Sequence, residues 1–154
     1  MTAQHMKPLQ PATTPWPDAP SDFGQGPVTM WMAPIGNTLQ PNTPLQDAIQ
    51  LMLASHGDHL VVCDAEGELF GLVCYRTLIG LVANGAYPGP KTIESLIDRN
   101  PVRVARSSSF VMALRRLDPP EVTCVVVVEK GRPVGLISET HLAHPTLALV
   151  ESSL

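Results

Sequence analysis

The chain has 154 residues, of which 44% are apolar and only 16% are charged, and its formal net charge is −4. This length is enough for one domain with a buried core, and the negative charge argues against a general nucleic-acid binder, which presents a basic face. Because no stretch approaches about 18 consecutive apolar residues and the first residues lack the apolar core of a signal peptide, we expect a cytoplasmic protein that binds neither nucleic acid nor a membrane.

Residues 1–27 contain six prolines, which exclude a helix or a central strand and predict a Pro-rich N-terminal tail. Trp16 and Phe23 are the large aromatic side chains of this tail. Two interpretations stay open. The segment is either a flexible tail, or an arm that these two side chains anchor on the folded part or on a second subunit.

The folded part is expected to begin with a short helical turn over 28–32 and a short extended piece near 37–40. The next segment has the pattern of an amphipathic helix, with Thr43 as N-cap, Pro44 as first residue and Gly57 at its end. Its apolar positions follow the helical period: Leu45, Ala48, Ile49, Met52 and Leu53.

Two apolar runs with a turn between them predict a β-hairpin. The runs, 60–63 and 69–74, are too short for independent helices, and the acidic turn 64–68 separates them. A second helix is expected over 75–84, with Gly85 as its C-cap.

The same order of elements recurs after the linker 86–90, which is rich in proline and glycine. Gly67 and Gly71 of the first copy match Gly131 and Gly135, each pair 64 positions apart. The recurrence is an internal repeat.

The second copy supplies each element again. It has a short extended piece at 102–105, a helix with Ser108 as N-cap, apolar strands at 124–128 and 133–138, and a last helix that starts at Ser138. The run Asp-Pro-Pro after its first helix stops that helix early and explains why the spacing falls from 65 at the helices to 64 at the hairpins.

Each copy therefore has the order strand, helix, strand, strand, helix. The expected class is α/β (α+β), with two β-α-β-β-α repeats packed with pseudo-two-fold symmetry around a shared core. The expected organisation is the tail 1–27, a first repeat over 28–87, and a second repeat with a C-terminal extension over 88–154.

Each copy resembles a CBS motif, named after cystathionine β-synthase, and the pair resembles a Bateman module. The resemblance covers residues 28–142 and rests on the capped helix, the acidic residue after the first hairpin strand (Asp64 and Glu129), and the Gly-apolar-apolar-small runs that begin at Gly71 and Gly135. It implies a regulatory module, not an enzyme, that senses an adenine nucleotide or related small anion and modulates a partner protein. The ligands it implies are AMP, ADP, ATP or S-adenosylmethionine.

The family's binding run is Gly-apolar-apolar-Thr/Ser-x-x-Asp, in which the hydroxyl holds phosphate at a helix N-terminus and the Asp holds the ribose. The second copy keeps the hydroxyl and replaces the Asp, whereas the first copy has lost both. The resemblance implies a ligand cleft made by the second copy's run and its short strand: Val102, Arg103, Gly135, Leu136, Ile137, Ser138 and His141. The matching positions of the first copy are Gly71, Cys74 and Thr77.

Two alternatives stay open. One is a ligand-free structural dimerisation module, and the other is a metal site built from the His-x-x-His pairs at 56–59 and 141–144. Neither a Gly-x-Ser-x-Gly motif nor a phosphate loop is present, so no enzyme is expected. The three cysteines show no metal-ligand spacing and are expected to be buried free thiols.

A homodimer is expected, because the short helices carry more apolar groups than a module of this size buries alone. These groups are Trp31, Met32, Leu78, Leu81, Val82 and Leu142. The regulated partner protein is not identified by the sequence.

Overall fold

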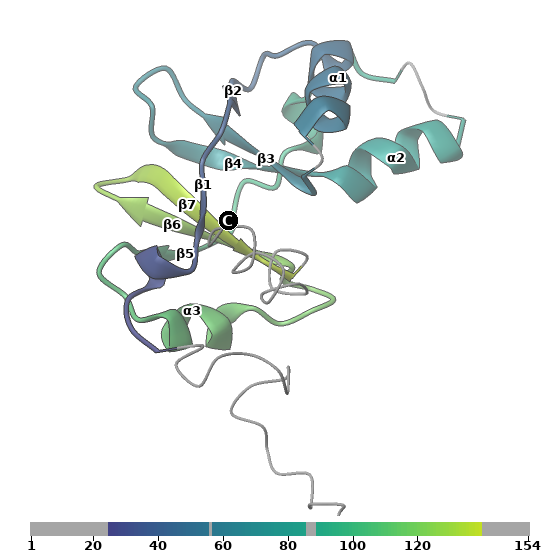
Figure 1. The fold of residues 1–154 in the computed structure, drawn as a ribbon. Coiled ribbons are helices and arrows are strands. Elements are labelled where there is room, and N and C mark those ends of the chain that lie inside the picture. The colour runs from purple at the N-terminus through teal and green to yellow at the C-terminus, as the bar shows by residue number, and fades with distance from the viewer. Residues whose placement is uncertain (1–24, 56, 86–88, 140–154) are drawn as a thin grey trace, which may run out of the picture.

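The computed structural model describes residues 25–55, 57–85 and 89–139, which form two facing β-sheets (Figure 1). One sheet has the strand order β1 (Ala33–Pro34), β7 (Arg132–Ser138), β6 (Cys124–Glu129), β5 (Val102–Ala105). The other has the order β2 (Thr38–Leu39), β3 (His59–Cys63), β4 (Leu69–Cys74). In each sheet the short strand of a repeat lies parallel to the first strand of its antiparallel hairpin.

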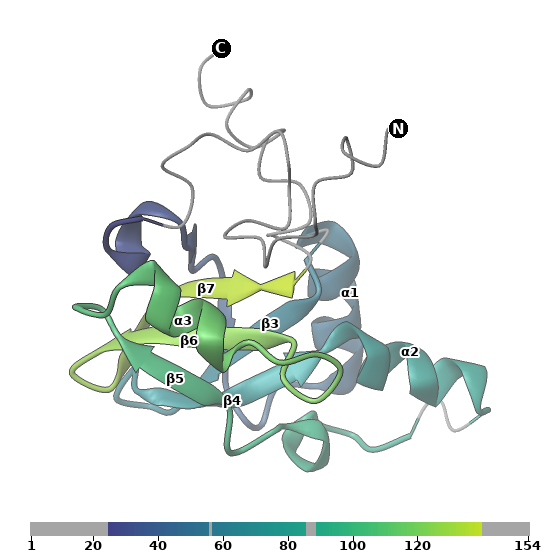
Figure 2. The same cartoon turned by 90° about the horizontal axis from the view of Figure 1, so that it is seen from below.

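Helices cover the outer sides of both sheets, so that the layers run helix, sheet, sheet, helix (Figures 1 and 2). The described helices are α1 (Leu45–Ser55), α2 (Tyr75–Ala83), α3 (Phe110–Arg116) and the short 3-10 turns η2 (Val28–Met30) and η3 (Glu94–Leu96). Helices α1 and α2 lie beside the three-stranded sheet, and α3 lies beside the four-stranded one. None of the helices in the described part of the chain is long and apolar enough to span a membrane.

The predicted strands and the helices at α1, α2 and α3 are confirmed, but both predicted N-caps are wrong. Helix α3 begins one residue later, because Ser109 and not Ser108 is the cap, and its hydroxyl accepts a hydrogen bond from the Met112 N–H at 3.2 Å. Helix α1 begins at Leu45, and the Thr43 hydroxyl accepts a hydrogen bond from the Gln40 N–H at 3.0 Å instead of capping the helix. In both cases the helix begins one residue later than the local pattern placed it.

The leading segments of the two repeats, residues 28–37 and 93–102, are exchanged between the two halves of the molecule. Strand β1 of the first repeat pairs antiparallel with β7 of the second, and Val28 is fully buried in the second repeat's core. Conversely, the second leading segment bridges to β4, and Ile93 is fully buried in the first repeat's core. Each core is therefore completed by a segment of the other repeat.

Gly71 and Gly135 lie where these exchanged segments cross the hairpin strands. A Cβ on Gly71 would overlap Ile97 and the carbonyl oxygen of Asp98, and a Cβ on Gly135 would overlap the Met32 side chain. The absence of a side chain thus allows the close approach at both crossings. Because Met32 and Ile97 are equivalent residues of the two repeats, the two crossings obey the pseudo-two-fold symmetry.

The two hairpins meet at the centre, as predicted. Their facing sides form an apolar core between the sheets, made of Val61, Cys63, Leu69, Leu72, Cys124 and Val126. At the hairpin tips, the Leu69 N–H donates to the carbonyl oxygen of Gly131 at 2.8 Å and ties one hairpin to the other.

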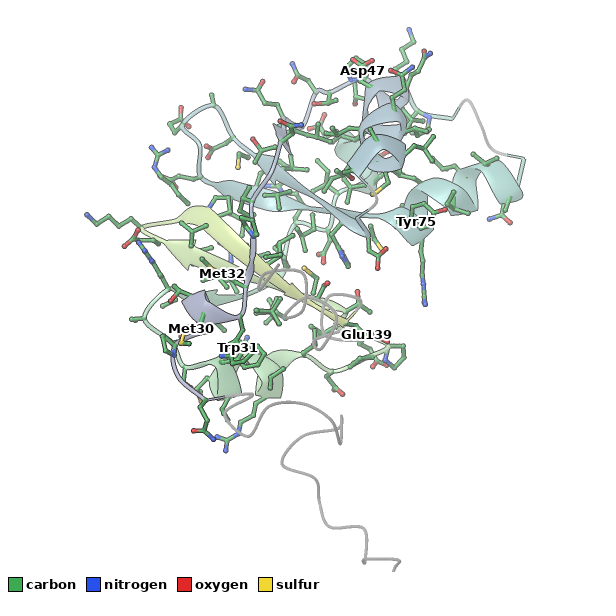
Figure 3. All side chains as sticks on the ribbon, viewed as in Figure 1. Met30, Trp31, Met32, Asp47, Tyr75 and Glu139 are labelled. Carbon is green, nitrogen blue, oxygen red and sulfur yellow. The ribbon has the colours of Figure 1, made fainter. Side chains whose placement is uncertain are left out.

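Most of the apolar side chains that motivated a dimer have partners within the chain. Trp31, labelled in Figure 3, stacks on Phe110 of α3. The two ring centroids are 5.4 Å apart. Leu78 is only 3% exposed. Val82 is 54% exposed, whereas Leu142, like the tail 1–24, lies outside the described residues. Of the six residues, Leu78 is therefore interior, whereas Trp31, Met32 and Leu81 are partly buried where they pack against the two cores.

Candidate functional site

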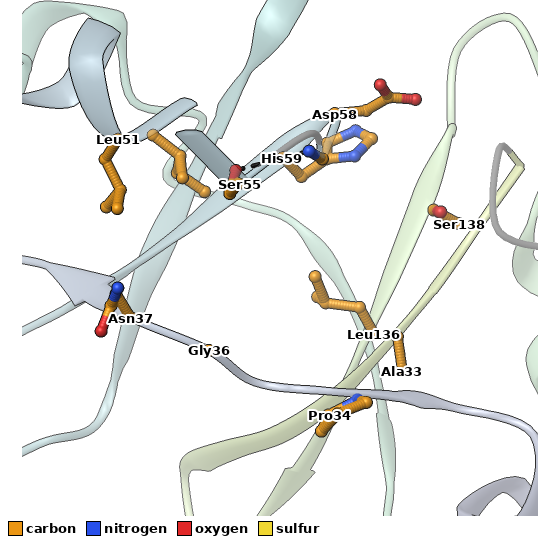
Figure 4. A pocket seen from close by; sticks show the side chains of 12 residues that line it. Ala33, Pro34, Gly36, Asn37, Leu51, Ser55, Asp58, His59, Leu136 and Ser138 are labelled. Atoms are coloured by element: carbon orange, nitrogen blue, oxygen red, sulfur yellow. Dashed lines mark hydrogen bonds between the residues drawn. The ribbon is translucent and has the colours of Figure 1, made fainter. Parts of the chain in front are cut away.

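A cleft of about 400 Å³ lies between the two repeats and is here called cleft 1 (Figure 4). One wall is made by the end of α1 and the start of β3, and the facing wall by β1 and β7. Its lining residues are Ala33, Pro34, Gly36, Asn37, Leu51, Ser55, Gly57, Asp58, His59, Leu60, Leu136 and Ser138. The lining is apolar beside β1 and polar where Asp58, His59 and Ser138 lie, as Figure 4 shows.

A second and smaller cleft of about 160 Å³, cleft 2, occupies the pseudo-symmetric position. Its lining residues are His59, Leu72, Cys74, Asp98, Asn100, Pro101, Val102, Glu121, Val122, Thr123 and Cys124. Leu72 and Cys74 correspond to Leu136 and Ser138 of cleft 1, 64 positions on. The internal repeat therefore produces two related clefts that differ in size and in polar groups.

The expected combination of Ser138 with the strand Val102–Ala105 in one cleft is wrong. Ser138 lines cleft 1, whereas Val102 lines cleft 2 together with Cys74. The reason is the exchange of leading segments, which places β1 of the first repeat beside β7 of the second. Each cleft is thus built from the leading segment of one repeat and the last strand of the other.

Five of the other expected site residues line neither cleft. Gly71, Gly135 and Ile137 are buried, and they contribute to the strand crossings and the cores. Arg103 and Thr77 are exposed on β5 and α2. Of the sequence-predicted residues, Leu136 and Ser138 remain in cleft 1, and His141 lies outside the described residues.

Sequence reasoning missed the residues at the start of β3. Asp58 and His59 line cleft 1, yet they belong to none of the family's binding runs. The internal repeat could have pointed to His59, because this residue stands 64 positions before Thr123 and both precede an apolar run. The segment 33–37 was also missed, because its two-residue strand has no periodic pattern.

His59 lies at the junction of both clefts. Its Nε2 is hydrogen-bonded to Thr123 Oγ1 at 3.2 Å, so two equivalent residues of the two repeats meet at the pseudo-two-fold axis. His59 also lines a third cavity of about 320 Å³, here called the central hollow, which shares residues with each cleft. The two clefts therefore open toward a common space.

Stability is expected to decrease as the pH falls below 6.5, partly through His59. Burial lowers its pKa from the ordinary value of 6.5, although nearby Asp58 opposes the shift. The unfolded state therefore binds the proton first, and the stabilisation is complete above pH 6.5 and is lost as the pH falls toward the lower folded-state pKa. Urea unfolding of the wild type and of His59→Gln at pH 7.5, 6.5 and 5.5 measures the effect. An equal pH dependence in both proteins would contradict it.

The cysteines are free thiols, as expected, and two of the three are buried. Cys63 and Cys124 are buried, and Cys74 is partly exposed. Burial, with smaller contributions from Cys74 and Asp58, raises the pKa of the Cys124 thiol to about 12. A thiol with this pKa is a poor nucleophile near neutral pH.

The described residues hold no group of three or more His, Cys, Asp or Glu side chains that could bind a metal ion. His56, His141 and His144 lie outside these residues. The metal hypothesis based on the two His-x-x-His pairs therefore stays a hypothesis.

Sequence comparison matches the CBS domain twice, over residues 30–84 and 93–144. The chain is 25% identical over 148 residues to the CBS domain-containing protein CBSCBSPB3 of Arabidopsis thaliana, covering 96% of this chain and 26% of that protein. It is 26% identical over 107 residues to an L-aspartate semialdehyde sulfurtransferase of Methanosarcina acetivorans, covering 69% of this chain and 21% of that protein. The chain thus spans about a quarter or less of the curated relatives it matches.

Solved structures share the fold. CBSX2 in complex with AMP, from Arabidopsis thaliana, has a TM-score of 0.66 at 22% identity, covering 80% of this chain and 98% of that chain. A CBS domain pair in complex with 5′-methylthioadenosine and S-adenosyl-L-methionine has a TM-score of 0.66 at 19% identity, covering 77% of this chain and 97% of that chain. These likenesses confirm the predicted α+β arrangement of two repeats.

Proposed function

This chain belongs to the CBS domain family as a tandem pair, and from that premise we propose that it is a cytoplasmic regulatory module that binds an adenosine-containing ligand and modulates a partner protein. The proposed site is cleft 1. The module is proposed to be regulatory and to have no enzymatic activity of its own, a role that the tandem CBS pair supports.

The size of cleft 1 supports this assignment. Small-molecule pockets usually measure about 300–1,000 Å³ and combine apolar walls with a few polar groups. Cleft 1, at about 400 Å³, lies within this range, and cleft 2, at about 160 Å³, lies below it. The apolar side chains of Ala33, Pro34 and Leu136 offer a surface for an adenine ring, and solved relatives of this fold hold AMP or S-adenosylmethionine.

Ser138 is the observation that carries the proposal. It keeps the hydroxyl of the family's binding run, and it lines the larger of the two clefts. The equivalent residue of cleft 2 is Cys74, whose thiol is a weak hydrogen-bonding group. A single ligand in cleft 1 is therefore the expected stoichiometry.

Replacing Ser138 with alanine should weaken ligand binding by about 1–3 kcal/mol, the usual effect of losing one hydrogen bond in a buried polar site. Calorimetry with AMP, ADP, ATP and S-adenosylmethionine measures this change. Ser107→Ala, at an exposed serine that lines neither cleft, is the matched control and should bind like the wild type. Failure of the wild type to bind any of these ligands at millimolar concentration would reject the proposed function.

We also propose that the module is a homodimer. Leu53 of α1 and Ile79 and Val82 of α2 are 60%, 41% and 54% exposed, so neighbouring helices present apolar groups on one surface. Light scattering at micromolar concentration should report twice the mass of one chain, and Val82→Glu should shift the protein to the monomer. A wild-type monomer would leave the ligand-binding proposal standing and remove this one.

A further inference from the structure

The central hollow is acidic in the part that the structure describes. Its charged lining residues are three carboxylates and one guanidinium: Asp58, Glu121, Glu139 and Arg76. His59 also lines the hollow, and burial lowers its pKa, so its imidazole is neutral near pH 7 and does not offset the carboxylates.

The hollow continues the polar end of cleft 1. Asp58 and His59 line both cavities. Tyr75 and Glu139, which follow the ends of β4 and β7 and are labelled in Figure 3, also line the hollow. The adenine ring is placed against the apolar end of cleft 1 by the proposed function, and the polar end beside Asp58 and His59 is then left for the nucleoside's 5′ substituent. The volume of about 320 Å³ leaves room for such a substituent.

We propose that cleft 1 selects nucleosides whose 5′ substituent is cationic or uncharged, of the adenosyl sulfonium and thioether class, over nucleotides with a 5′ phosphate. This inference rests on the proposed function, since it takes the adenosine part to bind in cleft 1. Three carboxylates beside the substituent repel a phosphate and attract a sulfonium or ammonium group. Among the ligands that the family resemblance implied, this selectivity favours S-adenosylmethionine over AMP, ADP and ATP.

The charged groups also predict how the preference responds to salt. Glu121, Glu139 and Arg76 are exposed, so added salt screens their field at distances of roughly 10 Å. The preference for the cationic ligand is therefore largest at low ionic strength and decreases as salt is added. A ligand recognised by shape alone would not respond in this way.

The test is calorimetry on the full chain at low and high salt with S-adenosylmethionine, S-adenosylhomocysteine, 5′-methylthioadenosine, AMP and ATP. S-adenosylhomocysteine lacks only the methyl group and positive charge of the sulfonium, so it isolates the effect of that charge. S-adenosylmethionine should bind at least about tenfold more tightly than AMP at low salt, and ATP should bind most weakly.

The double variant Glu121→Gln, Glu139→Gln should reduce this ratio severalfold, while Glu66→Gln, in the hairpin turn away from the hollow, should leave it unchanged. AMP binding as tightly as S-adenosylmethionine would overturn the inference and leave the proposed function standing. A ratio that the double variant does not change would also overturn it. If none of the five ligands binds, the proposed function fails and the inference fails with it.

Discussion

Replacing Gly71 with alanine is expected to lower the free energy of unfolding by about 3 kcal/mol, near the upper end of the usual range for overpacking. A Cβ at this position would overlap the Asp98 carbonyl oxygen and the Ile97 side chain. The carbonyl belongs to the backbone and cannot rotate away. The exchanged segment of the second repeat must therefore separate from β4, and the hydrogen bonds between Leu72 and Asp98, at 2.8 and 3.1 Å, are weakened.

Two further variants make this measurement specific. Gly135→Ala should cost only about 1–2 kcal/mol, because the new Cβ would meet the flexible side chain of Met32. Gly80→Ala should stabilise by about 0.5–1 kcal/mol, because this glycine is inside α2 and a Cβ there meets no atom within 4 Å. Urea unfolding of the three variants gives the ranking. Equal stabilities of Gly71→Ala and Gly80→Ala would contradict the close crossing at β4.

Phe110→Ala is expected to have the largest effect on stability, about 3–5 kcal/mol. Phe110 has no exposed surface, and its ring stacks on Trp31 of the exchanged segment. Truncation creates a cavity in the second core and also removes the surface on which this segment packs. The equivalent residue of the first repeat is Leu45, which is 3% exposed, so Leu45→Ala is the control for simple loss of a buried side chain.

A double-mutant cycle separates the two effects. Trp31→Ala should couple to Phe110→Ala by about 0.5–1.5 kcal/mol, the usual value for an aromatic pair, and should add independently to Leu45→Ala. The coupling would show that the segment before β1 belongs to the second core in solution. Absence of coupling between Trp31 and Phe110 would contradict the exchange of leading segments.

The strands, helices and repeat could be predicted because each rests on a local pattern. Each pattern involves residues within a few positions of one another, as in the apolar runs at 60–63 and 124–128, the hairpin turns and the helical period over 45–53. The recurrence of these patterns at a spacing of 64 or 65 predicted the symmetry. Ser108 was misplaced as an N-cap because the neighbouring Ser109 takes that position, and Thr43 because its hydroxyl accepts a hydrogen bond from the Gln40 N–H instead.

The composition of the clefts could not be predicted in the same way. Ser138 was found from the binding run, but its neighbours come from a two-residue strand, Ala33–Pro34, that has no strand pattern of its own. Its pairing with β7 is a contact between residues about 100 positions apart, which no local pattern encodes. The motif therefore identified the residue, and only the fold identified the cleft to which it belongs.

The central claim is that cleft 1, assembled from the first leading segment, the start of β3 and the end of β7, binds the adenosine part of a ligand. A titration with 5′-methylthioadenosine, followed by amide chemical shifts, tests it most directly, because this ligand is uncharged and the result does not depend on the acidic hollow. We predict that the largest shifts occur at Gly36, Asn37, Asp58 and Ser138. Shifts that instead cluster at Asn100 and Val102 in cleft 2, or no shifts at millimolar ligand, would contradict the claim.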